Sequence, residues 1–361
     1  MTSFDAGRTL GERFRAHGRA LSSSRAPSPL YAELMTCLAD DWDAGGVVRR
    51  ICRGWEDAPP GSVVQLRLLA GLHRVVLRGD APALAAYYPS AGGDRPPTGV
   101  WPVARPVLEA HAAELSDALA TAPQTNEPGR SAALLVGVLH AVRQTGLPRV
   151  RLLEIGASAG LNLLVDRFRI TGDGWASGPA DSPVVLADAV RGRLPRPLPD
   201  WSVHGRRGCD LEPVDVAVPA GRLQLESFVW PDHVGRFRRL RAALDVAQRV
   251  PVPVDRGAAS TWLAQQLAAP GDPGVLTVVW HSITRMYWPG SEVAAVDEVV
   301  ADAGSRLPLA RVAMEYGDDG PGAQLTVQVS QGQGLGEPRR LASVADHGVP
   351  VRLDPGVALD A

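Results

Sequence analysis

The residues of this sequence with the clearest chemical potential lie between positions 154 and 160, where the chain reads Glu-Ile-Gly-Ala-Ser-Ala-Gly. An apolar segment at 149–155 predicts a strand before them, and the residues after them predict a helix. Gly156 permits a tight turn, and Gly160 lets the helix pack close to the strand. Small residues between the glycines let a ligand approach the backbone, and N–H groups at the helix start can bind a polar group. We therefore expect a ligand-binding strand–turn–helix.

The spacing of the glycines indicates which ligand this turn binds. A dinucleotide fingerprint would read GxGxxG, whereas this turn reads GxxxG, which suits a ligand without phosphate. The pattern E-x-G-x-x-x-G resembles the corresponding motif of class I methyltransferases, which implies S-adenosylmethionine as cofactor. The acidic residue would orient the backbone of the first turn or meet the methionine ammonium, directly or through water. The cofactor-binding residues expected here are Glu154, Gly156, Ala157, Ser158 and Gly160.

A second acidic residue should follow the next core strand and hold the ribose hydroxyls. Asp210 follows a plausible strand and is preferred, with Asp173 and Asp215 as alternatives. Residues 169–200 would then be an insertion. A further strand ends near Asp255 and Gly257, where the adenine edge is expected, although Asp255 suits a helix N-cap equally well.

Catalytic chemistry is expected after the strand 275–280, since ligands of this fold meet the carboxyl ends of parallel strands. His281 follows that strand and is the predicted general base, because an imidazole can take a proton from the attacking group near neutral pH. Tyr287 and Trp288 would wall the substrate pocket. The alternative is a structural histidine that caps the following turn.

A polar segment before the helix at 129–146 is the second candidate for substrate binding. Gln124, Asn126, Glu127 and Arg130 could close over the cofactor or hold a polar substrate. Helix capping explains the same residues equally well, with Thr125 or Asn126 as N-cap and Glu127 favoured by the helix dipole.

The same glycine turn also fits G-x-S-x-G, the nucleophile elbow of serine hydrolases. Ser158 would be the nucleophile, and Asp297 or Glu315 followed by His347 could complete a triad. Glu154 directly before the turn fits the methyltransferase pattern better, so the hydrolase remains an alternative.

Composition removes several other classes of protein. All 37 basic residues are Arg, so P-loop, pyridoxal phosphate and protein kinase chemistry, which need Lys, cannot be built. A net charge of −2 gives no basic field for nucleic acid. The three cysteines match no metal spacing and indicate a reducing compartment. We expect no metal site, no apolar signal segment and no membrane span, and hence a cytoplasmic protein.

The elements that position these residues divide the chain in two. Apolar residues at helical spacing predict a helical domain over residues 1–146, with a loop at 90–103. Strands alternating with helices predict a Rossmann-like α/β domain over 147–361, ending in an antiparallel pair. Its expected strands are 149–155, 183–187, 201–205, 222–229, 250–255, 275–280, 309–315, 324–329 and 349–353, and its helices are 161–168, 233–249, 258–269 and 291–304.

Several segments together resemble an uncharacterised family of unknown function that is common in actinobacteria. They are QTNEPGRSAALL, LLEIGASAGLNLLVDRF, RRGCDLEPVDV, VWPD and VVWHSITRMYWP, and the resemblance spans roughly residues 5–355. It implies a helical N-terminal region joined to a class I methyltransferase-like core. Two departures stand out: Gly257-Ala258-Ala259 replaces an expected Gly-Asp-Ala, and an aromatic-Gln pair is missing near Arg285-Met286. These changes put the adenine contact and the substrate pocket in question.

The resulting prediction is an α/β enzyme that uses S-adenosylmethionine to methylate a small molecule. Two alternatives stay open: a cofactor-binding Rossmann protein without methyl transfer, and the serine hydrolase. The sequence does not indicate the acceptor, the methylated atom or the oligomeric state.

Overall fold

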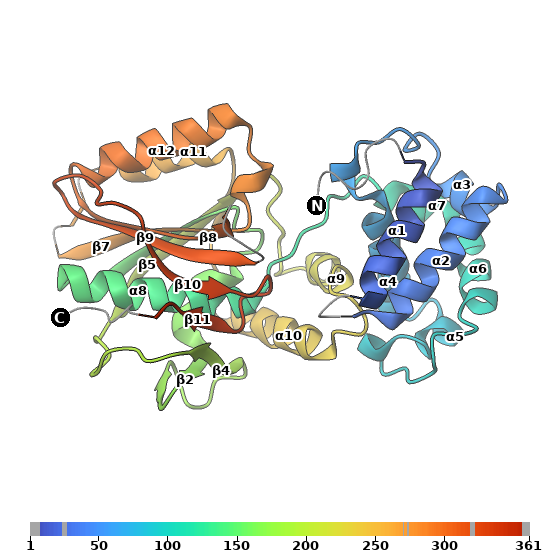
Figure 1. Ribbon diagram of the computed structural model, residues 1–361, viewed down its shortest axis with the longest axis horizontal. Coiled ribbons are helices and arrows are strands. Elements are labelled where there is room, and N and C mark those ends of the chain that lie inside the picture. The colour runs from blue at the N-terminus through green and yellow to red at the C-terminus, as the bar shows by residue number, and fades with distance from the viewer. Residues whose placement is uncertain (1–7, 24–26, 270, 273, 318–321, 356–361) are drawn as a thin grey trace. The chain divides into compact units, whose positions relative to one another are not determined.

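The computed structural model describes residues 8–23, 27–269, 271–272, 274–317 and 322–355. The chain forms two compact units, each described by itself below. The helical unit consists of residues up to Thr125 together with Val218–Arg238, and the α/β unit consists of Asn126–Ala217 and the residues from Arg239 onward (Figure 1).

These units differ from the expected boundary at residue 146. Helix α8 (Ser131–Thr145) belongs to the α/β unit, because its face packs on strands of the sheet rather than on other helices. Residues 218–238, expected within the α/β domain, belong to the helical unit. The strand expected at 222–229 is wrong: this segment forms helix α9 (Pro219–Ser227), in which Gly221 and Leu225 are buried one turn apart.

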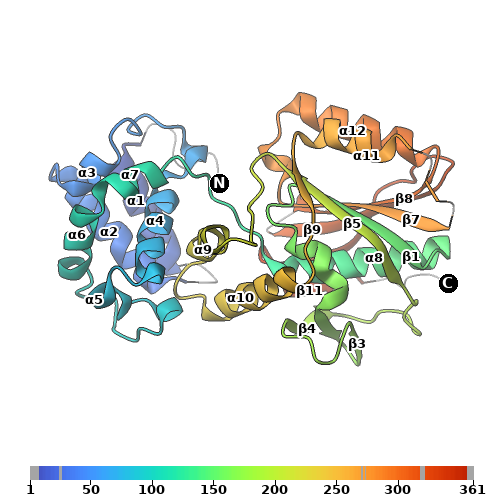
Figure 2. The same ribbon diagram turned by 180° about the vertical axis from the view of Figure 1, so that it is seen from behind.

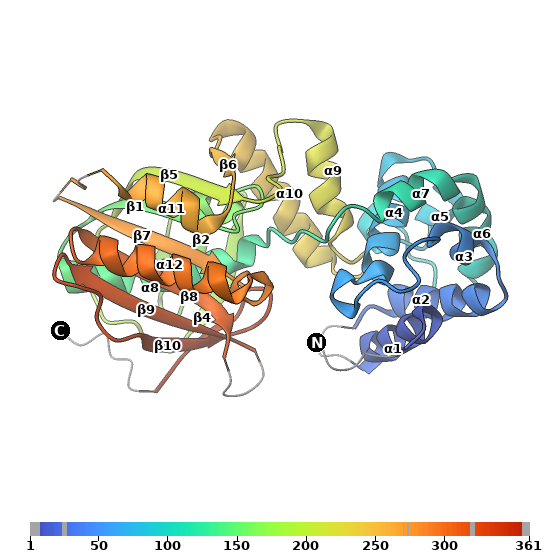
Figure 3. The same cartoon turned by 90° about the horizontal axis from the view of Figure 1, so that it is seen from above.

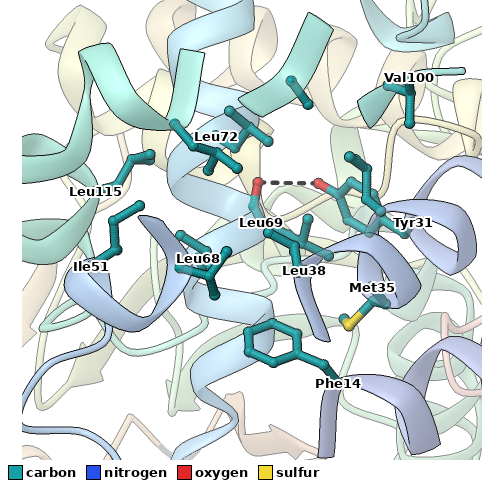
Figure 4. Close-up of a cluster of buried hydrophobic side chains, with 14 of the residues drawn as sticks. Phe14, Tyr31, Met35, Leu38, Ile51, Leu68, Leu69, Leu72, Val100 and Leu115 are labelled. Atoms are coloured by element: carbon teal, nitrogen blue, oxygen red, sulfur yellow. Dashed lines mark hydrogen bonds between the residues drawn. The ribbon is translucent and has the colours of Figure 1, made fainter. Parts of the chain in front are cut away.

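The helical unit is a cluster of short helices around one apolar core. Its helices are α1 (Leu10–Ser23), α2 (Pro29–Asp43), α3 (Val47–Ile51), α4 (Val64–Arg78), α5 (Pro82–Ala85), α6 (Trp101–Ala110), α7 (Ala112–Ala118) and α9. Figure 4 shows Phe14, Met35, Leu38 and Leu68 meeting between α1, α2 and α4. The apolar spacing that predicted these helices therefore reports their buried faces. Helix α10 (Val234–Arg249) runs through the unit boundary at Arg238.

The α/β unit is built on an eleven-stranded sheet with the order β3-β2-β4-β11-β10-β9-β8-β7-β1-β5-β6. Five neighbouring strands are parallel, in the spatial order β6-β5-β1-β7-β8. They are β6 (Val254–Arg256), β5 (Ser202–Asp210), β1 (Arg149–Ile155), β7 (Val275–Ser282) and β8 (Pro308–Tyr316). This is a doubly wound order, and its direction of winding reverses between β1 and β7. Figure 2 shows β1, β5 and β7 from behind.

The rest of the sheet is a meander followed by an insertion. Strands β9 (Ala323–Gln331), β10 (Arg339–Val344) and β11 (Val351–Leu353) each pair antiparallel with the strand before them. The expected antiparallel ending is therefore present, but it contains one more strand than predicted, β10, and it lies inside the sheet and not at its edge. The segment 169–200 does contain inserted strands: β2 (Arg169–Gly172), β3 (Trp175–Ser177) and β4 (Val185–Arg191) extend the sheet beyond β11.

Helices cover the two faces of the parallel strands. Helices α11 (Ala259–Leu267) and α12 (Gly290–Gly304) lie on one face and α8 on the other (Figures 1 and 3). An apolar cluster that includes Leu153, Trp262, Val279 and Val300 fills the space under α11 and α12. The segment after β1 is a 3-10 helix, η4 (Leu161–Arg167), instead of the expected α-helix. All five parallel strands therefore end at one edge of the unit.

The contact between α8 and the sheet yields a first prediction. A Cβ on Gly137 of α8 would lie 2.3 Å from Val312 Cγ1 of β8. Gly137→Ala is expected to lower the free energy of unfolding by about 1–3 kcal/mol, because the added atom forces packed elements apart. Gly235→Ala is the control, since its Cβ meets no atom within 4 Å. Equal thermal unfolding midpoints for the two variants would contradict this close packing.

Candidate functional site

The turn after β1 has the backbone geometry that its sequence predicts. Gly156, Ser158 and Gly160 have φ values of 70°, 55° and 72°, in the left-handed region that favours glycine. A Cβ on Gly160 would lie 2.9 Å from Val252 Cγ1, so the glycine allows the turn to approach the segment before β6. At Gly156 the space is taken by the side chain of Thr284. The chain therefore reverses direction within a few residues of the end of β1.

The backbone N–H groups of this turn are not free donors, contrary to expectation. Asp210 Oδ2 accepts from Ser158 N at 2.8 Å, and Asn126 Oδ1 accepts from Ala159 N and Leu161 N at 3.2 and 3.0 Å. The N–H groups of residues 157 and 160 donate to backbone carbonyl oxygens. A buried amide needs an acceptor, and in this protein side chains supply it. Asn126 and Asp210 therefore hold the turn in place.

Glu154 lies one residue before the turn and is almost fully buried, with 1% of its surface exposed. Its Oε1 accepts from Asn162 Nδ2 at 3.3 Å. Its Oε2 and Trp280 Nε1 are both buried without a hydrogen bond of ordinary geometry among the described residues, although the indole acts on this carboxyl as a donor that lowers its pKa. Burial raises the pKa of Glu154 to about 8, against smaller opposing effects of Asn162, Trp280 and Arg130. The carboxyl is thus mainly protonated at neutral pH, and a nearby positive charge would favour its ionised form.

Asp210 ends β5, which neighbours β1, and Asp255 lies in β6, the next strand beyond β5. Besides Ser158 N, Asp210 accepts from Glu212 N at 2.9 Å, so both of its carboxylate oxygens bind backbone. Asp255 is held by two hydrogen bonds from Arg207, at 2.6 and 2.8 Å, and one from Trp262 Nε1 at 2.7 Å. These partners lower the pKa of Asp255, Arg207 most strongly. Asp255 is therefore engaged in a structural ion pair and is not the N-cap of α11.

Gly257 follows β6 and lies beside the end of β5. Its N–H donates to the carbonyl oxygen of Asp210 at 3.0 Å, and a Cβ at this position would meet no atom within 4 Å. Ala258 is the N-cap residue of α11. The open space at Gly257 leaves room for a ligand next to the carboxyl end of β5.

The polar segment before α8 is divided by the unit boundary, with Gln124 in the helical unit and Asn126, Glu127 and Arg130 in the α/β unit. Glu127 is buried, and its Oε1 accepts from Gly129 N at 3.1 Å and from Arg239 Nε at 3.0 Å. It thereby caps the 3-10 turn η3 (Pro128–Arg130), a role expected for Thr125 or Asn126.

Arg130 reaches the end of the next strand, β7. Its Nη1 donates to the carbonyl oxygen of Ser282 at 3.0 Å. The structure thus brings Asn126 to the glycine turn and Arg130 to β7, where their described contacts are with the protein itself. A role in substrate binding stays a prediction for these residues.

His281 is buried at the end of β7 and belongs to a polar chain of side chains. Its Nδ1 lies 2.8 Å from Glu315 Oε1, and because a carboxylate only accepts, Nδ1 carries the proton. Its Nε2 then accepts from Arg311 Nε at 3.4 Å. Burial lowers the pKa of His281 in spite of Glu315, so the imidazole is neutral at neutral pH. Both ring nitrogens are thus engaged with protein groups, and a role as general base stays a prediction.

The surroundings of His281 include a cavity of about 280 Å³. Trp288 packs against the imidazole in a tilted arrangement, with ring centroids 5.8 Å apart. Tyr287, expected to wall a pocket, ends the short turn η5 (Arg285–Tyr287), is 72% exposed and is not among the residues that line this cavity. The cavity is lined by His281, Arg285, Arg311, Ala313, Glu315, Tyr316, Gly317, Gln324, Thr326 and Gln328.

The residues proposed for a hydrolase triad have other partners. Glu315 bonds to His281, and Asp297 bonds to Arg285 and Arg311. The carbonyl oxygen of His347 packs against Gly129. The described contacts therefore do not assemble the expected Asp/Glu–His pair.

Sequence reasoning missed Asn162, Arg311 and Gln324 as site residues. Arg311 and Glu315 occupy alternate positions of a strand, and Gln324, Thr326 and Gln328 alternate in the next. Polar residues with period two on strands that are otherwise apolar were the available signal. Within the described ranges, no group of three or more possible metal ligands gathers, and no helix is long and apolar enough to span a bilayer.

The pKa of Glu154 yields a second prediction. A carboxyl whose folded pKa is near 8 and whose unfolded pKa is ordinary stabilises the fold fully at acid pH, and this stabilisation is lost as pH rises toward 8. Relative to Glu154→Gln, the native protein should therefore lose stability between pH 5 and 8 by up to about 1.4 kcal/mol per pH unit.

Thermal unfolding of both proteins across this range measures the effect. Glutamine keeps an oxygen that can accept from Asn162, so packing is conserved while the titration is removed. A difference between the two unfolding midpoints that does not change with pH would show that Glu154 is ionised throughout.

Comparison with known proteins gives one match. The model of one protein family covers residues 12–352, which is nearly the whole chain. No curated protein and no solved structure matches. The chain therefore belongs to the bacterial family described as "Uncharacterized protein conserved in bacteria (DUF2332)".

Proposed function

We propose that this protein is an S-adenosylmethionine-dependent methyltransferase acting on a small molecule, with the cofactor at the carboxyl ends of β1 and β5. The observation that carries the proposal is the strand order β6-β5-β1-β7-β8, which places Glu154 and Asp210 at the ends of adjacent parallel strands beside the winding reversal. Ligands of open α/β sheets bind at this point. The glycine turn between these two carboxyls is the second supporting feature.

The residues at these strand ends fit the proposed cofactor. Glu154 has a buried oxygen without a hydrogen bond of ordinary geometry in the described chain, and S-adenosylmethionine brings an ammonium and a sulfonium group whose positive charge would stabilise the carboxylate. Each oxygen of Asp210 binds one backbone N–H and keeps a second lone pair for a ribose hydroxyl. The bound cofactor would supply an electrophilic methyl group.

In this proposal His281 accepts the proton that the acceptor releases. Glu315 holds the proton on Nδ1, and Nε2 can take up a proton once Arg311 Nε gives up its hydrogen bond to that lone pair. Methyl transfer depends more on alignment of the reacting atoms than on proton transfer. Replacement of His281 is therefore proposed to slow the reaction without abolishing cofactor binding.

A second candidate function is cofactor binding without methyl transfer. It is favoured by the N–H groups of the glycine turn, which already donate hydrogen bonds to protein acceptors, and by Thr284, whose side chain occupies the space at Gly156. Both features reduce what the backbone of the turn offers a ligand. The serine hydrolase has no such support, because Glu315 and Asp297 are engaged elsewhere.

Isothermal titration calorimetry with S-adenosylmethionine and S-adenosylhomocysteine tests the proposal. Both ligands are expected to bind, and Asp210→Asn should weaken binding by about tenfold or more, or about 1.4 kcal/mol, because an acceptor for a ribose hydroxyl is lost. Asp215→Asn is the matched control, since Asp215 is exposed and bonds only to Ala217 N among the described residues.

Two results would count against the proposal. Absence of binding at millimolar ligand, with the native protein folded, would make it untenable. Binding without turnover over a broad panel of acceptors would instead support the non-catalytic candidate.

A further inference from the structure

The cavity beside His281 lies on the face of β8 and β9 that is opposite α8. The register pairs Arg311 with Gln328, Ala313 with Thr326 and Glu315 with Gln324. Side chains at alternate positions share a face, so these six residues form one band, which is polar apart from Ala313. The residues between them, among them Val312, Leu325 and Val327, are buried on the other face. A polar band inside an apolar sheet calls for an explanation other than packing.

Ala313 opens the space in the middle of this band. It is the only small side chain among the six and lies between Arg311 and Glu315 on β8. The cavity that results has a volume of about 280 Å³. This is close to the lower end of the range for small-molecule sites, roughly 300 Å³. The space therefore suits a small metabolite and not a peptide or a nucleic acid.

The Arg311 end of the cavity has a hydrogen-bond donor to spare. Arg311 Nη1 donates to Asp297 Oδ1 at 2.7 Å and Nε donates to His281, whereas its Nη2 has no acceptor within the described chain. Arg285 binds the same Asp297 with two hydrogen bonds, at 2.8 and 2.7 Å. Two guanidinium groups thus share the Asp297 carboxylate at this end, and the second carboxylate of the cavity, Glu315, lies at the other end.

The Glu315 end of the cavity has an acceptor to spare. All hydrogen bonds that Glu315 accepts from the described residues are made by its Oε1. The donors are His281 Nδ1 and the backbone N–H groups of Thr284 and Arg285. Its Oε2 receives no hydrogen bond from the described residues. The side chains of Gln324 and Thr326 likewise make no hydrogen bond with the part of the chain that is described, although both line the cavity.

We propose that this cavity binds a small carboxylic acid that also carries a hydroxyl or ammonium group. The carboxylate of the ligand would lie on Arg311 Nη2, where a charge-assisted hydrogen bond is available. The hydroxyl or ammonium group would donate to Glu315 Oε2, and Gln324 and Thr326 would complete the contacts. That this compound is the methyl acceptor rests on the proposed function, but its binding does not.

Ligand-observed NMR with matched probes tests the site. The probes are lactate, alanine, propionate and lactamide, and their phenyl-substituted counterparts. Lactate, alanine or a phenyl counterpart of either is expected to bind at least about tenfold more tightly than two matched probes. These are propionate, which lacks the hydroxyl or ammonium donor, and lactamide, which lacks the carboxylate. Comparison of lactate with alanine shows whether the site prefers a hydroxyl or an ammonium donor.

Two variants locate the binding in this cavity. Ala313→Leu fills the space, and Ala301→Leu makes the same change at an exposed position of α12. Gln324→Glu keeps the shape of a half-buried side chain and adds a negative charge, which should repel the hydroxy acids, whose net charge is negative, and leave the uncharged lactamide unaffected. Ala313→Leu is expected to weaken binding of whichever acid binds, and Gln324→Glu that of a hydroxy acid, by about tenfold or more, and Ala301→Leu is not.

The proposal fails if no acid of the panel binds the folded native protein at millimolar concentration. It also fails if the acid that binds native protein binds a folded Ala313→Leu variant equally well, or if a hydroxy acid binds a folded Gln324→Glu variant equally well. Calorimetry with S-adenosylmethionine on the same variants is expected to give an unchanged Kd. Failure of the acid site is thereby distinguishable from failure of the cofactor proposal.

Discussion

A tight turn between two glycines leaves several backbone N–H groups pointing inward, and each of them needs an acceptor away from water. An unsatisfied buried donor costs about 1–3 kcal/mol, so this turn could not persist without partners. Asn126 accepts from two of these groups and Asp210 from a third. Asn126 precedes α8 and Asp210 ends β5. Their hydrogen bonds therefore hold three separate segments together at the end of β1: the glycine turn, the start of α8 and the end of β5. The arrangement of the whole strand edge depends on these hydrogen bonds.

Desolvation dominates the ionisable groups at the same edge. Glu154 on β1 and His281 on β7 are both almost fully buried, and burial raises the pKa of the first and lowers that of the second. An acid and a base on adjacent parallel strands are therefore both held uncharged near neutral pH. This suits a site in which one group awaits a positive ligand and the other accepts a proton. Arg311 and Glu315 extend this polar chain into the cavity beside β8.

Local patterns predicted the parts of the fold that are encoded locally. Strand 149–155 and the glycine turn follow from an apolar run and from residues that tolerate a positive φ, and both are present. The strand predicted at residues 222–229 was wrong because alternating leucines in a short segment fit a helix face as well as a strand. The acceptors of the turn and the pairing of Ala313 with Thr326 were not predictable, since they depend on segments that are distant in the sequence.

In the proposed function, Glu154 meets a positively charged cofactor. Calorimetric titration of S-adenosylmethionine at pH 7 in buffers of different ionisation enthalpy counts the protons released on binding. A carboxyl with a pKa near 8 that becomes ionised beside a cation should release nearly one proton per bound ligand, and Glu154→Gln should release none. Binding without proton release, or equal release by the native protein and the variant, would contradict the account.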